Sequence, residues 1–205
     1  MAAAVPVIVR TNHAAAVPRQ IDAKMTTRFS LELELKIRQC ARRDLPQLEW
    51  FGLYTEYRQL IEEAFRRQQA GEVKMLVADL DDFPVGQAWL DLSVRETDSV
   101  GVIWALRVFP LLRNHGIGSR LMIAAERLLF ERGYRWSELT VDQQEPRARR
   151  LYERLGYRSA GSTEGLLSYT TPEKKFVALD LQLWIFRKRL RPRAMEWEVS
   201  QTSRE

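Results

Sequence analysis

Strict alternation of apolar and polar residues marks the first regular part of the chain. Five apolar residues, from Phe29 to Ile37, alternate with polar ones. Because alternate side chains of a strand point to opposite faces, this pattern predicts a half-buried strand. The following Asp44-Leu45-Pro46-Gln47 combines an N-cap residue, a first-turn proline and a glutamine three residues on, which predicts the start of a first helix.

Helical and extended periods then follow one another along the chain. Residues 55–70 have apolar side chains at helical spacing, and Gly71 ends that helix. Strands alternating with helices predict an α/β fold: a single domain whose mixed sheet carries helices on both faces. The expected later elements are strands at 73–80, 85–92 and 100–108, a helix at 116–132, a strand at 136–142, a helix at 145–155 and a strand at 176–186.

Composition and charge divide the chain into three parts. Residues 1–27 are rich in Ala, Val and Pro without a helical or strand period, and we expect a disordered extension there. Residues 28–188 form the predicted domain, and 189–205 a basic, flexible tail. The net charge of +5 lies in the ends, because 28–186 is neutral overall. Solvated tails explain the charge, and a polyanion-binding tail is the alternative.

Several classes of protein are excluded by residue counts. The single cysteine, Cys40, rules out an internal disulfide framework and a multi-cysteine metal site. Two histidines, His13 and His115, leave little for a metal cluster. No apolar run approaches the roughly 20 residues that cross a bilayer. We therefore expect a soluble, cytoplasmic protein without a metal or a membrane partner.

The segment from Leu106 to Leu121 carries the clearest chemical signal. A strand leads into a loop with Arg113, and Gly116 and Gly118 then open an apolar-periodic helix. A helix start exposes unpaired N–H groups with partial positive charge, and glycines let a phosphate approach the backbone. The segment therefore predicts a pyrophosphate cradle. It lacks the Gly-Lys-Ser/Thr of a Walker loop and the third glycine of the dinucleotide fingerprint.

A second motif follows about 30 residues later. The pattern V-x-P-x-x-R-x-x-G-x-G-x-x-L, beginning at Val108, precedes the L-x-V of Leu139, the A-x-x-L-Y that ends at Tyr152, and Leu155-Gly156-Tyr157. The two motifs, in this order, resemble the GNAT N-acetyltransferase superfamily. The resemblance implies the fold of that family, with a centrally splayed mixed sheet.

The resemblance also implies roles for particular residues. Tyr152 matches the general acid that protonates the departing CoA thiolate, and a backbone N–H near Val108 would polarise the thioester carbonyl. The pantetheine arm of acetyl-CoA would pair with Leu106, Arg107 and Val108 as an added strand. The pyrophosphate would lie on the cradle formed by Arg113, Asn114, His115, Gly116, Ile117, Gly118 and Ser119.

Two parts of the site stay open. Glu145 stands where the family often has Asn, Thr140 stands where some members carry a Glu base, and 103–105 offer no acid. The base is therefore Asp91, Asp142, Glu56 or ordered water. Aromatic side chains either line an acceptor pocket or belong to the core, and carboxylates either attract an amine or belong to a solvated face: Trp50, Phe51, Tyr54, Tyr57, Trp89, Trp104 and Tyr169, with Glu56, Glu62 and Glu63.

These observations favour an enzyme that moves an acetyl group from acetyl-CoA to a primary amine by direct attack. The alternatives are a non-catalytic acyl-CoA-binding regulatory module, favoured by Glu145 and the missing base, and an acetyltransferase for a ribosomal or nucleic-acid-associated protein. The expected partners are acetyl-CoA and an amine-bearing small molecule or protein, with no nucleic acid and no metal. A homodimer stays open.

Overall fold

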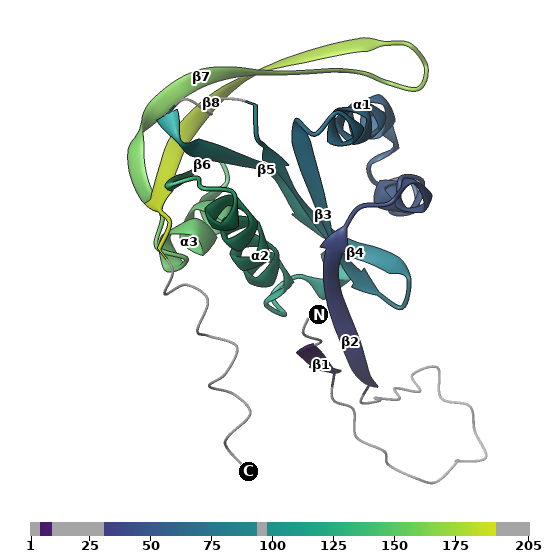
Figure 1. Cartoon of the computed structure of the whole chain (residues 1–205). Helices are drawn as coiled ribbons and strands as arrows, with labels where there is room; N and C mark the ends of the chain where they lie inside the picture. The colour runs from purple at the N-terminus through teal and green to yellow at the C-terminus, as the bar shows by residue number, and fades with distance from the viewer. Residues whose placement is uncertain (1–4, 10–30, 94–97, 192–205) are drawn as a thin grey trace, which may run out of the picture.

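One mixed sheet runs through residues 5–9, 31–93 and 98–191, the parts of the chain that this computed structural model describes (Figure 1). In the described residues the strand order is β1-β2-β3-β4-β5-β6-β8-β7, and β5 and β6 are the one parallel pair. The elements in chain order are β1 (Val5–Val9), β2 (Leu31–Gln39), α1 (Arg58–Gln69), β3 (Val73–Leu80), β4 (Phe83–Asp91), β5 (Val100–Val108), α2 (Ile117–Glu131), β6 (Trp136–Asp142), α3 (Pro146–Arg154), β7 (Arg158–Thr170) and β8 (Phe176–Arg189).

Helices cover both faces of this sheet, as the sequence predicts. Alternate residues of β3 enter two separate cores: Met75 and Val77 pack with Ile61 of α1, whereas Leu76 and Ala78 pack with the buried side chains of α2 and α3. Figure 1 shows α1 on one side of the sheet and α2 with α3 on the other. The predicted α/β class is therefore confirmed.

The sheet opens between its two parallel strands. The pairing of β5 with β6 covers only 100–102 of β5 against 136–138 of β6, although both strands continue beyond it. Beyond Val102, the edge of β5 that faces β6 has no strand partner among the described residues. This is the central splay that the sequence predicts.

The N-terminal expectation is wrong in part. Val5–Val9 is not an irregular extension but forms β1, which pairs antiparallel with β2 from Val5↔Leu35 to Val9↔Leu31. The edge of a sheet offers unpaired N–H and C=O groups to any extended segment within reach, and this pairing leaves no local signal in the sequence. The rest of 1–27 lies outside the described residues.

The C-terminal boundary also shifts. β8 continues to Arg189, and the N–H of the buried Leu190 donates a 2.9 Å hydrogen bond to the carbonyl of Arg135. The domain therefore includes residues that the sequence assigns to the tail. Residues 192–205 lie outside the described part.

The first predicted helix does not form. Residues 42–44 and 47–49 form separate 3-10 turns, and the backbone then turns through left-handed conformations at Trp50 and Phe51, with φ of 43° and 58°. A left-handed residue ends a right-handed helix. The reason is tertiary, because the carboxylate of Asp44 is bound by Arg38 of β2 and does not serve as a free N-cap.

Arg38 fixes this irregular segment against the sheet. Its Nη1 and Nη2 donate to the two carboxylate oxygens of the fully buried Asp44 at 2.6 and 2.9 Å, and its Nε donates to Asp79 at 2.5 Å. Burial would raise the pKa of Asp44, but hydrogen bonds from Arg38 and from the Ala41 N–H bring that pKa below its usual value. The segment that leads to Trp50 and Tyr54 is therefore held by a buried charge network.

Gly101 sets how closely α2 approaches β5. A Cβ built on Gly101 would lie 2.3 Å from Cδ2 and 2.7 Å from Cδ1 of Leu129, which is itself fully buried. We expect Gly101→Ala to lower the free energy of unfolding by about 1–3 kcal/mol in urea titration, because Leu129 has no free space to move into. Leu129→Ala removes the clash, so the double variant should lose less than the sum of the two single losses. Additive losses would contradict this contact.

Candidate active site

The end of β5 leads directly into the predicted cradle. The Phe109 N–H donates to the carbonyl of Val85 at 2.8 Å, and a 3-10 turn at 110–112 then reverses the chain. The exposed Arg113 donates from Nε to the carbonyl of Val108 at 3.1 Å. This hydrogen bond ties the predicted phosphate-binding cation to the last residue of the splayed strand.

The start of α2 has the properties of an anion site. Asn114 and Gly116 adopt left-handed φ of 66° and 77°, which turns the chain into the helix at Ile117. Among the described residues no side chain caps this helix, so the first-turn N–H groups, including those of Gly118 and Ser119, have no capping acceptor. Because these N–H groups carry the positive end of the helix dipole, they suit a phosphate group.

Gly118 lies where three elements meet. A Cβ added to it would lie 3.7 Å from Cγ2 of Val108 and 3.8 Å from Cδ2 of Leu151, both ordinary contacts. The first turn of α2 therefore packs between the end of β5 and the helix α3. The structure brings the cradle, the splayed strand and the helix of Tyr152 together, in agreement with the order of the two sequence motifs.

Tyr152 of α3 has a buried side chain. It is 8% exposed, belongs to the core that α2 covers, and meets the ring of Tyr157 edge-on at 5.9 Å between centroids. Burial raises the pKa of Tyr152 to about 12. The hydroxyl therefore stays protonated at neutral pH, as a proton donor must.

The three carboxylates that the sequence offers as a base lie in different parts of the fold. Asp91 pairs with Val102, at the far end of β5 from Val108, and its carboxylate accepts from Arg67 at 2.9 Å. Six residues of strand span about 20 Å, so Asp91 lies away from the cradle. Asp142 accepts from the Gln144 N–H at 2.9 Å and shapes the turn before α3. Glu56 also lies on the α1 side of the sheet, where the hydroxyl of Tyr169 donates to it at 3.2 Å.

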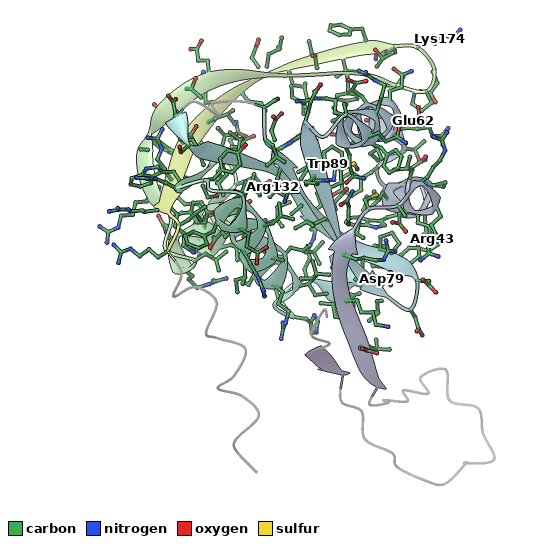
Figure 2. All side chains as sticks on the ribbon, viewed as in Figure 1. Arg43, Glu62, Asp79, Trp89, Arg132 and Lys174 are labelled. Carbon is green, nitrogen blue, oxygen red and sulfur yellow. The ribbon has the colours of Figure 1, made fainter. Side chains whose placement is uncertain are left out.

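The remaining polar candidates have structural or surface positions. Glu145 occupies the N-cap of α3, but its side chain makes no capping hydrogen bond. Glu63 pairs with Arg66 on the exposed face of α1, where Glu62 also lies (Figure 2). Cys40 is buried, and burial raises the pKa of its thiol to about 12. No acid–base role follows for these residues.

Aromatic side chains gather on the α1 side of β5. Tyr54 and Tyr57 lie 5.9 Å apart, and Tyr169 of the β7–β8 hairpin meets Tyr57 at 4.6 Å between ring centroids. That hairpin arches over α1 in Figure 1. Trp50 is different: it is buried, and its indole donates to the carbonyl of Pro84 at 2.6 Å, so it is a core residue.

Phe51 and the remaining tryptophans divide between surface and core. Phe51 is 87% exposed and stacks on Phe83. Trp89 is fully buried between the sheet and α1 (Figure 2), and it meets the partly buried Trp104 edge-on at 4.7 Å. Of the aromatic candidates, Tyr54, Tyr57 and Tyr169 therefore form one group, and Trp104 packs on the α1-side core beside Trp89.

The side chain of Arg107 points away from those of its two neighbours in β5. The sequence assigns it to the pantetheine strand together with Leu106 and Val108, but only those two neighbours pack on the α2 side. The guanidinium carbon of Arg107 lies 4.8 Å from the ring centroid of Tyr54 and 5.0 Å from that of Tyr57. Its side chain therefore points toward the tyrosines on the α1 side, although its backbone belongs to the splayed edge.

Gln87 of β4 was missed by the sequence reasoning. It is fully buried, it is the strand partner of Arg107, and its Oε1 accepts from the Trp89 indole at 2.9 Å. A polar residue between apolar ones in a strand with two buried faces was the available signal. Within the described residues no group of three potential ligands suited to a metal comes together, and no helix is long and apolar enough to cross a membrane.

A helix start with free first-turn N–H groups, beside an open strand edge, is suited to a phosphate-bearing donor in a group-transfer reaction. The chain belongs to the acetyltransferase (GNAT) family, whose sequence model matches residues 40–157, and it is an N-acetyltransferase. An uncharacterised N-acetyltransferase of Archaeoglobus fulgidus is 33% identical over 135 residues, which are 58% of this chain and 89% of that protein.

Solved structures agree on the fold. The N-acetyltransferase from Staphylococcus aureus Mu50 superposes with a TM-score of 0.61 at 15% identity, covering 77% of this chain and 99% of the other. A Salmonella typhimurium acetyltransferase that modifies the N-terminal serine of ribosomal protein L7/L12 gives 0.62 at 13% identity, covering 77% and 95%. At these identities the likeness concerns the fold.

Proposed function

We propose that the protein transfers the acetyl group of acetyl-CoA to a primary amine by direct nucleophilic attack. The observation that carries this proposal is the unpaired edge of β5 beside the uncapped start of α2. The open edge offers backbone hydrogen bonds to an extended pantetheine arm, and the N–H groups from Ile117 to Ser119, with Arg113, suit the pyrophosphate. The acetyl thioester then lies near the end of β5.

The chain's own groups supply what the reaction needs. The amine nitrogen forms a bond to the thioester carbon, the C–S bond breaks, and the amine loses a proton. A backbone N–H near Val108 stabilises the negative charge on the carbonyl oxygen. Glu56, or water ordered beside it, accepts the amine proton, because Glu56 contacts Tyr169 of the aromatic group, whereas Asp91 is held by Arg67 at the far end of β5.

Tyr152 provides a proton to the leaving sulfur. In water a thiol has a pKa of about 8.5, well below that of a buried tyrosine. An apolar site also raises the pKa of the leaving thiol, so the difference between its pKa and that of Tyr152 becomes smaller. Tyr152 therefore donates a hydrogen bond to the sulfur as negative charge develops on it, and transfers its proton as the C–S bond breaks. The predicted cytoplasmic location stays part of this proposal.

Calorimetric titration with CoA tests the cradle. We expect Gly118→Ala to fold with an unchanged or higher melting temperature, because its Cβ meets ordinary contacts and alanine favours a helix. The same methyl group blocks the approach of phosphate to the first-turn N–H groups, so the Kd of CoA should rise at least about 10-fold.

Arg113→Ala should also weaken CoA binding, by about 3- to 10-fold, through loss of one cation. Arg127→Ala is the matched control, since Arg127 lies on the last turns of α2 and pairs there with Glu131. If wild-type protein binds no CoA, the proposed function is wrong. If both cradle variants bind CoA like the control, the cradle is misplaced.

A further inference from the structure

Arg107 carries a buried charge without a counter-ion. Among the described residues, its buried Nη1 has no hydrogen-bond partner and no carboxylate acts on its charge. The rings of Tyr54 and Tyr57 contact the guanidinium but cannot accept its N–H groups as a carboxylate does. Arginine stays protonated in proteins, so this position holds a lasting, uncompensated positive charge.

Two further donors beside Arg107 are also unsatisfied. The Nε2 of Gln87 is buried and finds no acceptor in the described part of the chain, while the Oε1 of the same amide accepts from the Trp89 indole. The buried indole N–H of Trp104 likewise has no acceptor among the described residues. Gln87 pairs with Arg107 across β4 and β5, and Trp89 pairs with Trp104. These donors are therefore neighbours on one face of the sheet.

The three unsatisfied groups of this cluster are all hydrogen-bond donors, and one of them is positively charged. A ligand that binds them must therefore offer acceptors, and a negative charge favours its binding. A buried donor without an acceptor destabilises the protein, and a ligand oxygen that accepts a hydrogen bond from it removes that cost. One positive charge with two neutral donors matches one carboxylate: two oxygens, four lone pairs and a single negative charge. An ammonium group, which only donates, finds no acceptor in this cluster.

The position of the cluster separates this anion from CoA. Leu106 and Val108 face the α2 side, where the pyrophosphate cradle begins, whereas Arg107 faces Tyr54 and Tyr57 on the other side of the strand. Arg107 directly precedes Val108, where the proposed thioester lies. A carboxylate bound here belongs to the acceptor, and only a few bonds separate it from the reacting amine.

We propose that Arg107, Gln87 and Trp104 bind a carboxylate of the acceptor, so that the substrate is a small amino acid. This inference rests on the proposed function and narrows its acceptor class. A peptide N-terminus carries a neutral amide where the cluster requires a carboxylate. Glu56 lies on the same side of the sheet, where its carboxylate attracts the amino group of that substrate.

Matched substrate pairs test this directly. Each of the common amino acids is assayed with acetyl-CoA as the free acid and as its primary carboxamide, by following CoA release. For the best acceptor we expect kcat/KM for the acid to exceed that for the amide at least about 100-fold, because a site built around charged hydrogen bonds rejects an analogue that lacks the charge. Equal values for acid and amide would overturn the inference.

Three variants assign the preference to the cluster. Arg107→Met should reduce the acid-to-amide ratio to within about 3-fold, while calorimetry shows an unchanged Kd for CoA. Gln87→Glu keeps the oxygen that accepts from Trp89 and gives Arg107 an internal carboxylate. It should therefore fold with at least the wild-type melting temperature and lose turnover of the acids. Arg66→Met, which removes an exposed arginine of α1, should keep the wild-type ratio.

The outcomes separate the two levels of the proposal. If CoA binds but only peptide N-termini or polyamines are acetylated, the carboxylate site is wrong and the proposed function stands. If Gln87→Glu folds and still acetylates free amino acids, the cluster does not bind the carboxylate. If neither CoA binding nor CoA release occurs with any amine, the proposed function is itself wrong.

Discussion

Replacing Tyr152 with phenylalanine is expected to lower kcat about 100-fold, the usual loss when a general acid is removed. The Kd of CoA, measured by calorimetry, should change less than about 2-fold, because the ring and its packing remain and only a group that acts on the leaving sulfur is lost. Turnover is measured as CoA release once an acceptor is known. An unchanged kcat would remove Tyr152 from the mechanism.

Tyr157→Phe is the matched control for this experiment. The hydroxyl of Tyr157 shares a 2.7 Å hydrogen bond with Ser137 in the core, and its ring contacts that of Tyr152. Its removal should cost about 1 kcal/mol of stability and leave kcat near the wild-type value. A similar loss of kcat in both variants would indicate a packing effect and not proton donation.

The pH profile gives a second readout for Tyr152. Since burial raises its pKa to about 12, Tyr152 remains protonated throughout the accessible range. We therefore expect no loss of kcat from Tyr152 ionisation below about pH 11. A basic limb with a midpoint near pH 9 that disappears in Tyr152→Phe would contradict this placement.

Arg38→Met is expected to have the largest effect on stability. It leaves the buried carboxylates of Asp44 and Asp79 without their shared cation, and removing one partner of a buried ion pair costs about 3–5 kcal/mol. Urea unfolding at pH 7 measures this loss. Arg43→Met is the control, because Arg43 pairs with Asp82 at the exposed surface and should cost less than about 1 kcal/mol.

The pH dependence of this loss has a defined sign. In the wild-type protein the folded pKa of Asp44 is lowered, so its contribution is present above the unfolded value of about 3.9 and is lost as the pH falls through the folded pKa. In Arg38→Met the buried Asp44 loses the hydrogen bonds from Arg38, so burial raises the pKa of its carboxyl instead. The loss of unfolding free energy in Arg38→Met should therefore be smaller at pH 5 than at pH 7. A loss that does not change with pH would show that packing, not charge, explains it.

Local features of this protein were predictable from the sequence. The strand bounds at 100–108 and 136–142 match the structure, and the start of α2 falls within one residue of its expected place. Alternation, the glycines of the cradle and the spacing to Tyr152 act over a few residues, so they specify these elements without knowledge of the rest of the fold.

Features that depend on distant partners were not predictable. The expected helix at Asp44 is absent because Arg38, on a neighbouring strand, binds the carboxylate that would have capped it. β1 depends on pairing with a strand some 25 residues away. Asp91 and Glu56 are indistinguishable as candidate bases in the sequence, and only the sheet register places one of them far from the end of β5.

Arg107 shows most clearly where sequence information ends. The sequence alone determines that an arginine stands next to the last residue of the splayed strand, between two apolar residues. Strict alternation from Ile103, which faces α2, would point Arg107 toward α2 as well. The structure instead inserts a bulge at Ala105, with φ of 52° and a register shift against β4, so that Trp104 and Ala105 both face the α1 side.

One extra residue in a strand turns every following side chain to the other face. The spacing of residues within the motifs is thus enough to predict the family and the cradle, because glycines and helix starts act over a few residues. The side of the sheet on which the buried charge lies, and with it the proposed class of acceptor, is decided by a tertiary feature. No alternation pattern reveals that bulge, since it exists only in the register between β4 and β5.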